Sequence, residues 1–113
     1  MEKNNFSIIR GDDIAFNLIV NNSEGNPVDL TGVLVSFTMK VNTFDDDVDA
    51  VIKKDIGTHT DPTHGKTLIT LTHDDTNITP RNYYYDIQIT EVNGKISSMH
   101  SGIITVSTDI TLR

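Results

Sequence analysis

The sequence lacks cysteine and tryptophan altogether, and it holds only 2 alanines, 6 leucines and 3 glutamates among 113 residues. Without cysteine the chain can form neither a disulfide framework nor a thiolate metal site or nucleophile. The scarcity of Ala, Leu and Glu removes residues that favour helices. The chain is instead rich in residues branched at Cβ, with 15 Thr, 14 Ile and 9 Val. Because these side chains suit a pleated surface better than a helix, the composition predicts an all-β protein.

Long apolar runs and basic character are also missing. No stretch approaches the roughly 20 apolar residues that cross a bilayer, and residues 1–5 lack the apolar core of a signal peptide. The net charge of −7, with 13 aspartates, disfavours contact with nucleic-acid phosphates or anionic membranes. We therefore expect a protein that is made in the cytoplasm, is not secreted, and binds neither nucleic acid nor membrane. The length fits one domain over residues 1–113, with residues 1–5 as a flexible N-terminus.

The clearest strand pattern covers residues 78–92, which hold all three tyrosines. Tyr83 and Tyr85 begin an alternating row that two isoleucines continue, so in a strand the row shares one face. Residues 13–20 and 33–41 alternate in the same way. Polar turns separate these segments from weaker strand patterns at residues 5–10, 50–56, 66–72, 95–100 and 103–111. The spacing predicts an immunoglobulin-like antiparallel β-sandwich of about seven or eight strands.

Three local features refine this prediction. Asn93-Gly94 is a strong short hairpin signal and predicts a type I′ turn. Gly102 predicts a break or bulge in the strand that returns from this hairpin. Tyr83 and Tyr85 directly follow a turn that contains proline, which is typical of the tyrosine corner of immunoglobulin folds. We interpret both tyrosines as a structural corner, in which a phenol bonds to backbone across the end of the sandwich.

Four aspartates in residues 42–49 are the candidate ligands for a cation. A dedicated calcium site needs six to eight oxygens and usually a glycine turn, and the calcium-loop pattern of the EF-hand is absent. We therefore interpret this stretch as a solvated acidic loop and predict no metal and no cofactor. The four candidates are Asp45, Asp46, Asp47 and Asp49.

The four histidines show no ligand spacing, because no two of them have the i, i+2 spacing that places two ligands on one face of a strand. His59 and His64 share a loop in which they could meet Asp61, but a loop orients metal ligands poorly. We predict solvent-facing loop histidines. The sequence also has no nucleophile elbow and no phosphate-binding loop, so we predict that the protein is not an enzyme.

An ordered set of short motifs resembles a known family. The motifs are Arg10-Gly11-Asp12, Gly25-x-Pro27-x-Asp29-Leu30-Thr31-Gly32, Leu71-Thr72-x-x-Asp75-Thr76, Tyr83-x-Tyr85-Asp86-Ile87 and Gly102-x-Ile104-x-Val106. In this order and spacing the chain resembles the immunoglobulin-like domain of structural proteins of phage tails, most closely the N-terminal domain of the baseplate upper protein family (BppU type). The resemblance spans roughly residues 6–111.

This resemblance implies a virion component of the phage tail or baseplate. Such a protein would be an assembly scaffold that contacts other tail and baseplate proteins, as a symmetric homo-oligomer within the assembly. Exposed apolar residues are the predicted interface, since sizeable apolar patches usually mark contacts between proteins. The residues predicted to form this second apolar face are Ile9, Ile19, Leu34 and Ile103.

Two alternatives remain open from the residues alone. The first is a carbohydrate-binding immunoglobulin-like domain that contributes to adsorption on a host surface, for which Tyr84 and Phe44 are the candidate stacking pair. The second is a secreted adhesion domain that displays Arg10-Gly11-Asp12, and the missing export signal argues against it.

Overall fold

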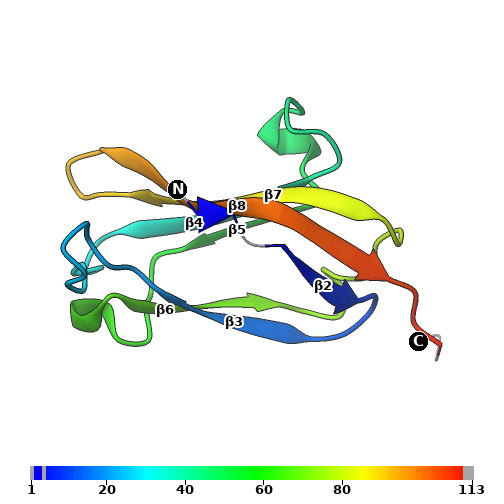
Figure 1. The fold of residues 1–113 in the computed structure, drawn as a ribbon, viewed down its shortest axis with the longest axis horizontal. Coiled ribbons are helices and arrows are strands. Elements are labelled where there is room, and N and C mark those ends of the chain that lie inside the picture. The colour runs from blue at the N-terminus through cyan, green and yellow to red at the C-terminus, as the bar shows by residue number, and fades with distance from the viewer. Residues whose placement is uncertain (1, 4, 111–113) are drawn as a thin grey trace.

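The computed structural model of the chain describes residues 2–3 and 5–110. Its strands form two sheets that face each other across one core (Figure 1). Sheet A has the order β1-β8-β7-β4-β5, with β2 also beside β8, and sheet B consists of β3 and β6. The strands are β1 (Glu2–Lys3), β2 (Phe6–Ile9), β3 (Ile14–Ile19), β4 (Leu34–Lys40), β5 (Ile52–Ile56), β6 (Lys66–Leu71), β7 (Asn82–Thr90) and β8 (Ile96–Ser107). Among the described residues the only helices are the single turns η1 (Asp47–Asp49) and η2 (Pro62–His64), too short to cross a membrane.

The strand pairs are antiparallel except at one edge of sheet A. There β1 and β2 both run parallel to β8, so that Phe6 lies opposite Ile104 and Ile9 opposite Ser107. The sequence predicted a wholly antiparallel sandwich, and this mixed edge was not foreseen. The order β5-β4-β7-β8 opposite β3-β6 corresponds to strands C′-C-F-G opposite B-E in a variable-type immunoglobulin domain. The predicted all-β, immunoglobulin-like sandwich is therefore confirmed.

The core lies between the inner faces of the two sheets. The inward row of β7 is buried as its alternation predicted, and so is the inward row of β4. Phe37 lies at the centre with no exposed surface, and its ring is 5.9 Å from that of Tyr85 and 6.3 Å from that of Phe16, measured between centroids. Burying side chains of this size removes the most apolar surface from water, so these rings are a main source of stability.

The connection between β7 and β8 differs from the prediction. A type I′ turn would need positive φ at both Asn93 and Gly94, but only Gly94, at φ 89°, has it. The loop is instead one residue longer, because Gly94 donates to the carbonyl of Glu91 and Glu91 donates to that of Lys95. β8 also continues through Gly102. The extra residue of its bulge is Met99, because Ile87 pairs with His100 while the next residue of β7 pairs with Ser98.

The two ends of the chain also depart from expectation. Residues 1–5 were predicted to be flexible, but Glu2–Lys3 form β1 against His100 and Ser101, and Asn5 accepts a hydrogen bond from the backbone of Ile103. Met1 and Asn4 lie outside the described residues. The last predicted strand ran to residue 111, but β8 ends at Ser107. Residues 108–110 then lead away from the sandwich, and residue 111 lies outside the described residues.

One side of the sandwich is sealed by residues 57–65, which lead from the edge of sheet A to sheet B. The ring of His59 lies 2.7 Å from the carbonyl oxygen of Val33 and 2.8 Å from the hydroxyl of Thr67 on β6, and so links the two sheets. Lys54 of β5 forms an ion pair of 2.8 Å with Asp75, which follows β6. We call this the closed side.

Gly65 ends the loop on the closed side. It adopts φ 70°, and a Cβ added there would lie 2.4 Å from the carbonyl oxygen of Val20 and 3.0 Å from that of Val28. Only glycine allows backbones to approach this closely at such a φ. Position 65 therefore requires glycine. Its close approach to Val20 also lets the Gly65 carbonyl accept the hydrogen bond from Val20 that extends the pairing of β3 with β6.

Candidate functional site

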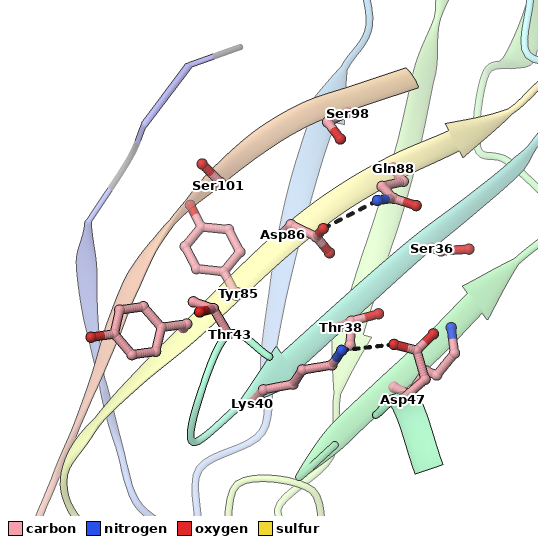
Figure 2. Close-up of a pocket in the computed structure, with 12 residues that line it drawn as sticks. Ser36, Thr38, Lys40, Thr43, Asp47, Tyr85, Asp86, Gln88, Ser98 and Ser101 are labelled. Atoms are coloured by element: carbon pink, nitrogen blue, oxygen red, sulfur yellow. Dashed lines mark hydrogen bonds and ion pairs between the residues drawn. The ribbon is translucent and has the colours of Figure 1, made fainter. Parts of the chain in front are cut away.

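The outer face of sheet A carries a polar groove. Because the side chains of directly paired residues point to the same face, the strand register sets β4, β7 and β8 side chains in rows across it. The two central rows are Thr38–Asp86–Ser101 and Ser36–Gln88–Ser98. Short hydroxyl side chains flank longer ones in both rows, which hollows the surface into an open groove of about 420 Å³ (Figure 2). Tyr84 and Lys40 line one end of this groove.

The loop 42–49 borders the groove and is held down by one lysine. Lys40 forms an ion pair of 2.8 Å with Asp47 and donates to the backbone carbonyl of Asp45 at 2.7 Å. The hydrogen bond between Lys40 and Asp47 holds the pKa of Asp47 below its ordinary value and raises the pKa of Lys40. The loop is therefore tied to sheet A rather than fully solvated, as Figure 2 shows for the Lys40–Asp47 pair.

Asp86 is the carboxylate in the middle of the groove. It is half-buried, and burial raises its pKa above the ordinary value, although the positive charge of Lys40 acts in the opposite direction. Gln88 donates its side-chain amide to Asp86 at 3.3 Å. The groove thus offers a carboxylate, an amide and several hydroxyls as hydrogen-bonding groups for a polar ligand. The alternation of β7 predicted the outward positions of Asp86 and Gln88. It could not predict their neighbours on β8, because the bulge at Met99 shifts the register there.

The four aspartates considered as cation ligands do not converge. Asp47 is paired with Lys40, and a carboxylate oxygen of Asp45 accepts from the backbone N–H of Asn42 at 3.1 Å. Asp46 and Asp49 flank and end the exposed turn η1. No group of three or more metal-ligating side chains occurs in the part of the chain that the structure describes.

The histidines lie in different surroundings. His64 and Asp61 meet at 3.0 Å in the exposed loop, as the sequence suggested. His59 does not join them, because its ring turns inward to Val33 and Thr67. The prediction that all loop histidines face solvent is therefore wrong for His59, which is half-buried. No pattern in the sequence shows that its two ring nitrogens meet partners on different strands.

The two corner tyrosines have different roles. The Tyr83 hydroxyl donates to the carbonyl of Thr79, four residues upstream, which is the geometry of a tyrosine corner. Tyr85 instead packs in the aromatic core against Phe6 and Phe37. Tyr84, the candidate for stacking on a sugar, lines the groove and is 45% exposed. Its expected partner Phe44 is 88% exposed and does not line the groove, so the two rings form no joint platform.

The four predicted interface residues do not form one apolar face. Leu34 and Ile103 both lie on the outer face of sheet A, but the two polar rows separate them. Ile9 lies on β2, and Ile19 lies on sheet B. Ile9, Ile19 and Leu34 are exposed, whereas Ile103 is half-buried beside Tyr84. The physical reason is the register, which sets apolar residues at opposite ends of the strands.

A second hollow lies between β2 and β3, on the side of the sandwich opposite to the closed side. Its main part has a volume of about 410 Å³ and is lined by both strands and by Ser107. A further hollow of about 190 Å³ continues along β3 and also includes Phe6 and Phe16. These two rings pack edge to face, 5.1 Å apart, and both are only half-buried. We call this the open side, because the aromatic core reaches the surface there.

The strand order and the tyrosine corner define the class of protein, an immunoglobulin-like β-sandwich. No family model matches the chain, and no curated protein matches it. Among solved structures, the chain is similar to the soluble domain of PmoD from Methylocystis sp. ATCC 49242 (Rockwell), with a TM-score of 0.53 and 7% identity over 89% of this chain and 77% of that one. At this identity the likeness concerns the fold alone.

A weaker likeness is to a chain in the crystal structure of ICOS in complex with ICOS-L and an anti ICOS-L VNAR domain. It has a TM-score of 0.41 and 13% identity, and it covers 95% of this chain and 55% of that one.

Proposed function

We propose that the chain is a structural and protein-interaction module of a tailed-phage or prophage tail or baseplate, where it acts as an assembly scaffold. The ordered motifs that resemble the baseplate upper protein family support this proposal. One of them forms the connection that leads into β4: Asp29 accepts hydrogen bonds from the backbone and hydroxyl of Thr31 at 2.9 and 2.7 Å, and Leu30 between them has no exposed surface. This motif therefore anchors the turn before β4 to the core, which helps the sandwich to hold binding surfaces in fixed positions.

The observation that carries the proposal is the incomplete sheet B. It has only two strands in the part of the chain that the structure describes, while sheet A has six. An unpaired strand edge next to half-buried aromatic residues is a surface that pairs readily with another chain. Ile19, which is 55% exposed on β3, adds apolar surface at the same edge. A protein whose role is assembly gains from such a surface, whereas a protein that acts alone gains nothing.

An antibody against the chain, applied to purified particles from the organism that encodes it, tests this role. We expect the antibody to label the tail tip or the tail tube in electron micrographs, and the chain to sediment with the particles at a fixed copy number. Intact tails without label, with the chain left in the soluble fraction, would exclude a virion role.

A second candidate function is binding of a carbohydrate in the groove of sheet A. The specific observation is the combination of Asp86, Gln88 and the serine and threonine hydroxyls with the ring of Tyr84 at the rim. Carboxylates, amides and one aromatic face are the groups that bind polyhydroxylated ligands. This function agrees with a host-adsorption role, and it uses a surface far from sheet B.

Glycan-array binding of the pure protein tests this second candidate. We expect Tyr84→Ala and Asp86→Asn each to weaken any binding by at least roughly tenfold, while Val92→Ala, at an exposed hairpin position, leaves it unchanged. Binding that tolerates both groove substitutions, or no binding at all, rejects the groove as a sugar site.

A further inference from the structure

The outer edge of β3 carries backbone groups that point away from β6. Val20 donates to Gly65 at 2.8 Å, which fixes the alternation of hydrogen-bonded pairs along this antiparallel ladder. Leu18, Phe16 and Ile14 therefore bond to β6. Ala15, Asn17 and Ile19, at the alternate positions, direct their N–H and C=O groups to the open edge. An extended segment laid beside β3 would find donors and acceptors at the spacing of a strand.

The cleft next to this edge suits alternate apolar side chains. The inward residues of β3 form its floor, and β2 forms its far wall. The rings of Phe6 and Phe16 are half-buried there, which leaves aromatic surface in contact with water. A strand paired with β3 would place every second side chain against these rings.

A segment with this pattern follows β8. Residues 108–113 read Thr-Asp-Ile-Thr-Leu-Arg, with apolar Ile110 and Leu112 two positions apart. Ile110 is 99% exposed, and Figure 1 shows the chain leaving the sandwich after β8. Branched and apolar residues at every second position are typical of a half-buried strand, yet the side chain of Ile110 is almost fully exposed.

We propose that residues 108–113 of a second copy of this chain add to the free edge of β3 as an antiparallel strand. The residue faces agree with this pairing. When Thr111 lies opposite Asn17 as a hydrogen-bonded pair, Ile110 and Leu112 lie opposite Leu18 and Phe16 and enter the cleft. The polar side chains of the segment then point outward.

Charge complementarity selects the antiparallel direction. In that direction Arg113 lies opposite Ala15, next to Asp13 on the same face of β3. Asp109 lies opposite Ile19, which is paired on its other side with Lys66 of β6. Both charges of the segment thus meet the opposite sign, which favours the pairing even between two chains with a net charge of −7.

Charge complementarity also excludes insertion of the chain's own segment 108–113 beside β3. Ser107 pairs with Ile9 and borders the cleft near Asp12 and Ile14, so its own continuation begins at the N-terminal end of β3. From there it can run only parallel to β3, which would bring Asp109 close to Asp12 and Asp13. Two like charges at this distance disfavour the parallel arrangement, so the donor is another copy.

This inference rests on the proposed role as an assembly module, and cross-linking of the pure protein tests it separately. The chain has no cysteine, so single cysteines report one contact each. Chains with Asn17→Cys are mixed with differently tagged chains with Thr111→Cys and oxidised with glutathione disulfide. In the proposed pairing the two Cα atoms are about 5.5 Å apart, within disulfide range. We expect a mixed dimer to form at least roughly tenfold faster than with Val92→Cys, an exposed control.

The double variant with both cysteines distinguishes the two sources of the donor. Disulfide-linked dimers or larger species support exchange between copies. A monomer with an internal disulfide, or a mixed-dimer rate equal to the Val92→Cys control, overturns the proposal. If cross-linking fails while the chain still sediments with tail particles, only the strand exchange is wrong and the virion role stands.

Sedimentation of the unmodified chain over a range of concentrations gives a second measurement. Ile110→Asp with Leu112→Asp should weaken self-association by at least roughly tenfold, and Ile110 is 99% exposed. Val92→Asp is the matched control, because it adds a charge at an exposed apolar position away from the cleft. Equal association of the two variants and the parent chain overturns the proposal.

Discussion

The closed and open sides bound one core but expose it differently. On the closed side, residues 57–65 link the sheets, and His59 and the Lys54–Asp75 pair join them by polar contacts. On the open side β2 and β3 are not paired with each other in the part of the chain that the structure describes, and two aromatic rings reach the surface. The polar contacts between the two sheets are thus concentrated on the closed side, which leaves the open side available for binding.

The largest expected effect compares an aromatic residue in the centre with one on the open side. Phe37→Ala should cost about 3–5 kcal/mol, because the ring has no exposed surface. Phe16→Ala should cost only about 2 kcal/mol, because part of its ring already contacts water. Urea unfolding of both variants measures the difference in the free energy of unfolding. The comparison is made at low protein concentration, because strand exchange at high concentration would itself cover Phe16. Equal losses at low concentration would show that the open side is covered even in the single chain.

The loop of the closed side is tested at its glycine. Gly65→Ala should cost about 2–4 kcal/mol, from the φ of 70° and the collision of Cβ with the carbonyl of Val20. Gly25→Ala is the matched control, since Gly25 has φ 83° but nothing within 4 Å of an added Cβ. We expect about 1 kcal/mol there. Thermal unfolding of the two variants isolates the contribution of the close backbone approach, and losses of the same size would contradict it.

The histidine that links the two sheets comes next. His59→Ala should cost about 1–3 kcal/mol, because it leaves the Val33 carbonyl and the Thr67 hydroxyl without their partner, and Thr67 is only 1% exposed. His64→Ala, which removes an exposed pair with Asp61, should change stability by less than about 0.5 kcal/mol. Chemical denaturation at pH 7 measures both. If His59→Ala were as mild as His64→Ala, the closed side would not depend on this contact.

The tyrosine corner lies at the end of the sandwich, between the two sides. Tyr83→Phe should cost about 1 kcal/mol, because the Thr79 carbonyl loses its donor while the ring stays buried. Tyr84→Phe removes a hydroxyl from a half-exposed ring, and the expected change is below about 0.5 kcal/mol. Hydrogen exchange of the β7 amides gives a local readout. Equal protection in the two variants would show that the corner is not needed.

The smallest effect concerns the ion pair of the closed side and its dependence on pH. Burial alone would raise the pKa of Asp75, but hydrogen bonds from Lys54 and Thr72 outweigh it and hold the pKa below its ordinary value. A carboxyl with a lowered pKa stabilises the fold at pH values above about 3.9, and this contribution is lost as pH falls through the lowered pKa.

Lys54→Met should therefore cost about 0.5 kcal/mol at pH 7, since both side chains are partly exposed, and the difference should vanish in acid. Lys95→Met, at an exposed hairpin position that forms no ion pair with another described residue, is the control. Unfolding curves between pH 7 and pH 2.5 measure the effect. A constant difference over this range would mean that Lys54 contributes by packing rather than by charge.

The sequence predicted the inward faces well and the pairing poorly. The alternation of Tyr83, Tyr85 and the residues after them gave the core face of β7 directly, because period two is a local property. The parallel placement of β2 beside β8 and the bulge at Met99 depend on contacts between distant segments. The type I′ prediction failed because loop length is set by the pair Glu91–Lys95 rather than by Asn93-Gly94 alone.

The polar groove and the open side show the same limit. Asp86 and Gln88 could be placed outward from β7, but the serines that complete the rows come from β8, whose bulge shifts the register. The four predicted interface residues were each placed by strand alternation. Whether these residues form one patch depends on the order of the strands in the sheets, and the alternation of side chains does not predict that order. The open cleft follows from the unpaired edge of β3, a property of the whole topology.

The parallel pairing of β2 with β8 has a consequence for synthesis of the protein. Ile9 pairs with Ser107, so β2 cannot find its neighbour until β8 has left the ribosome. Closing so long a segment is a slow step, because chain entropy is lost before the contact forms. The sandwich should therefore close only after β8 has been made, and nascent chains stalled before Ser107 should remain open to proteases that the folded protein resists.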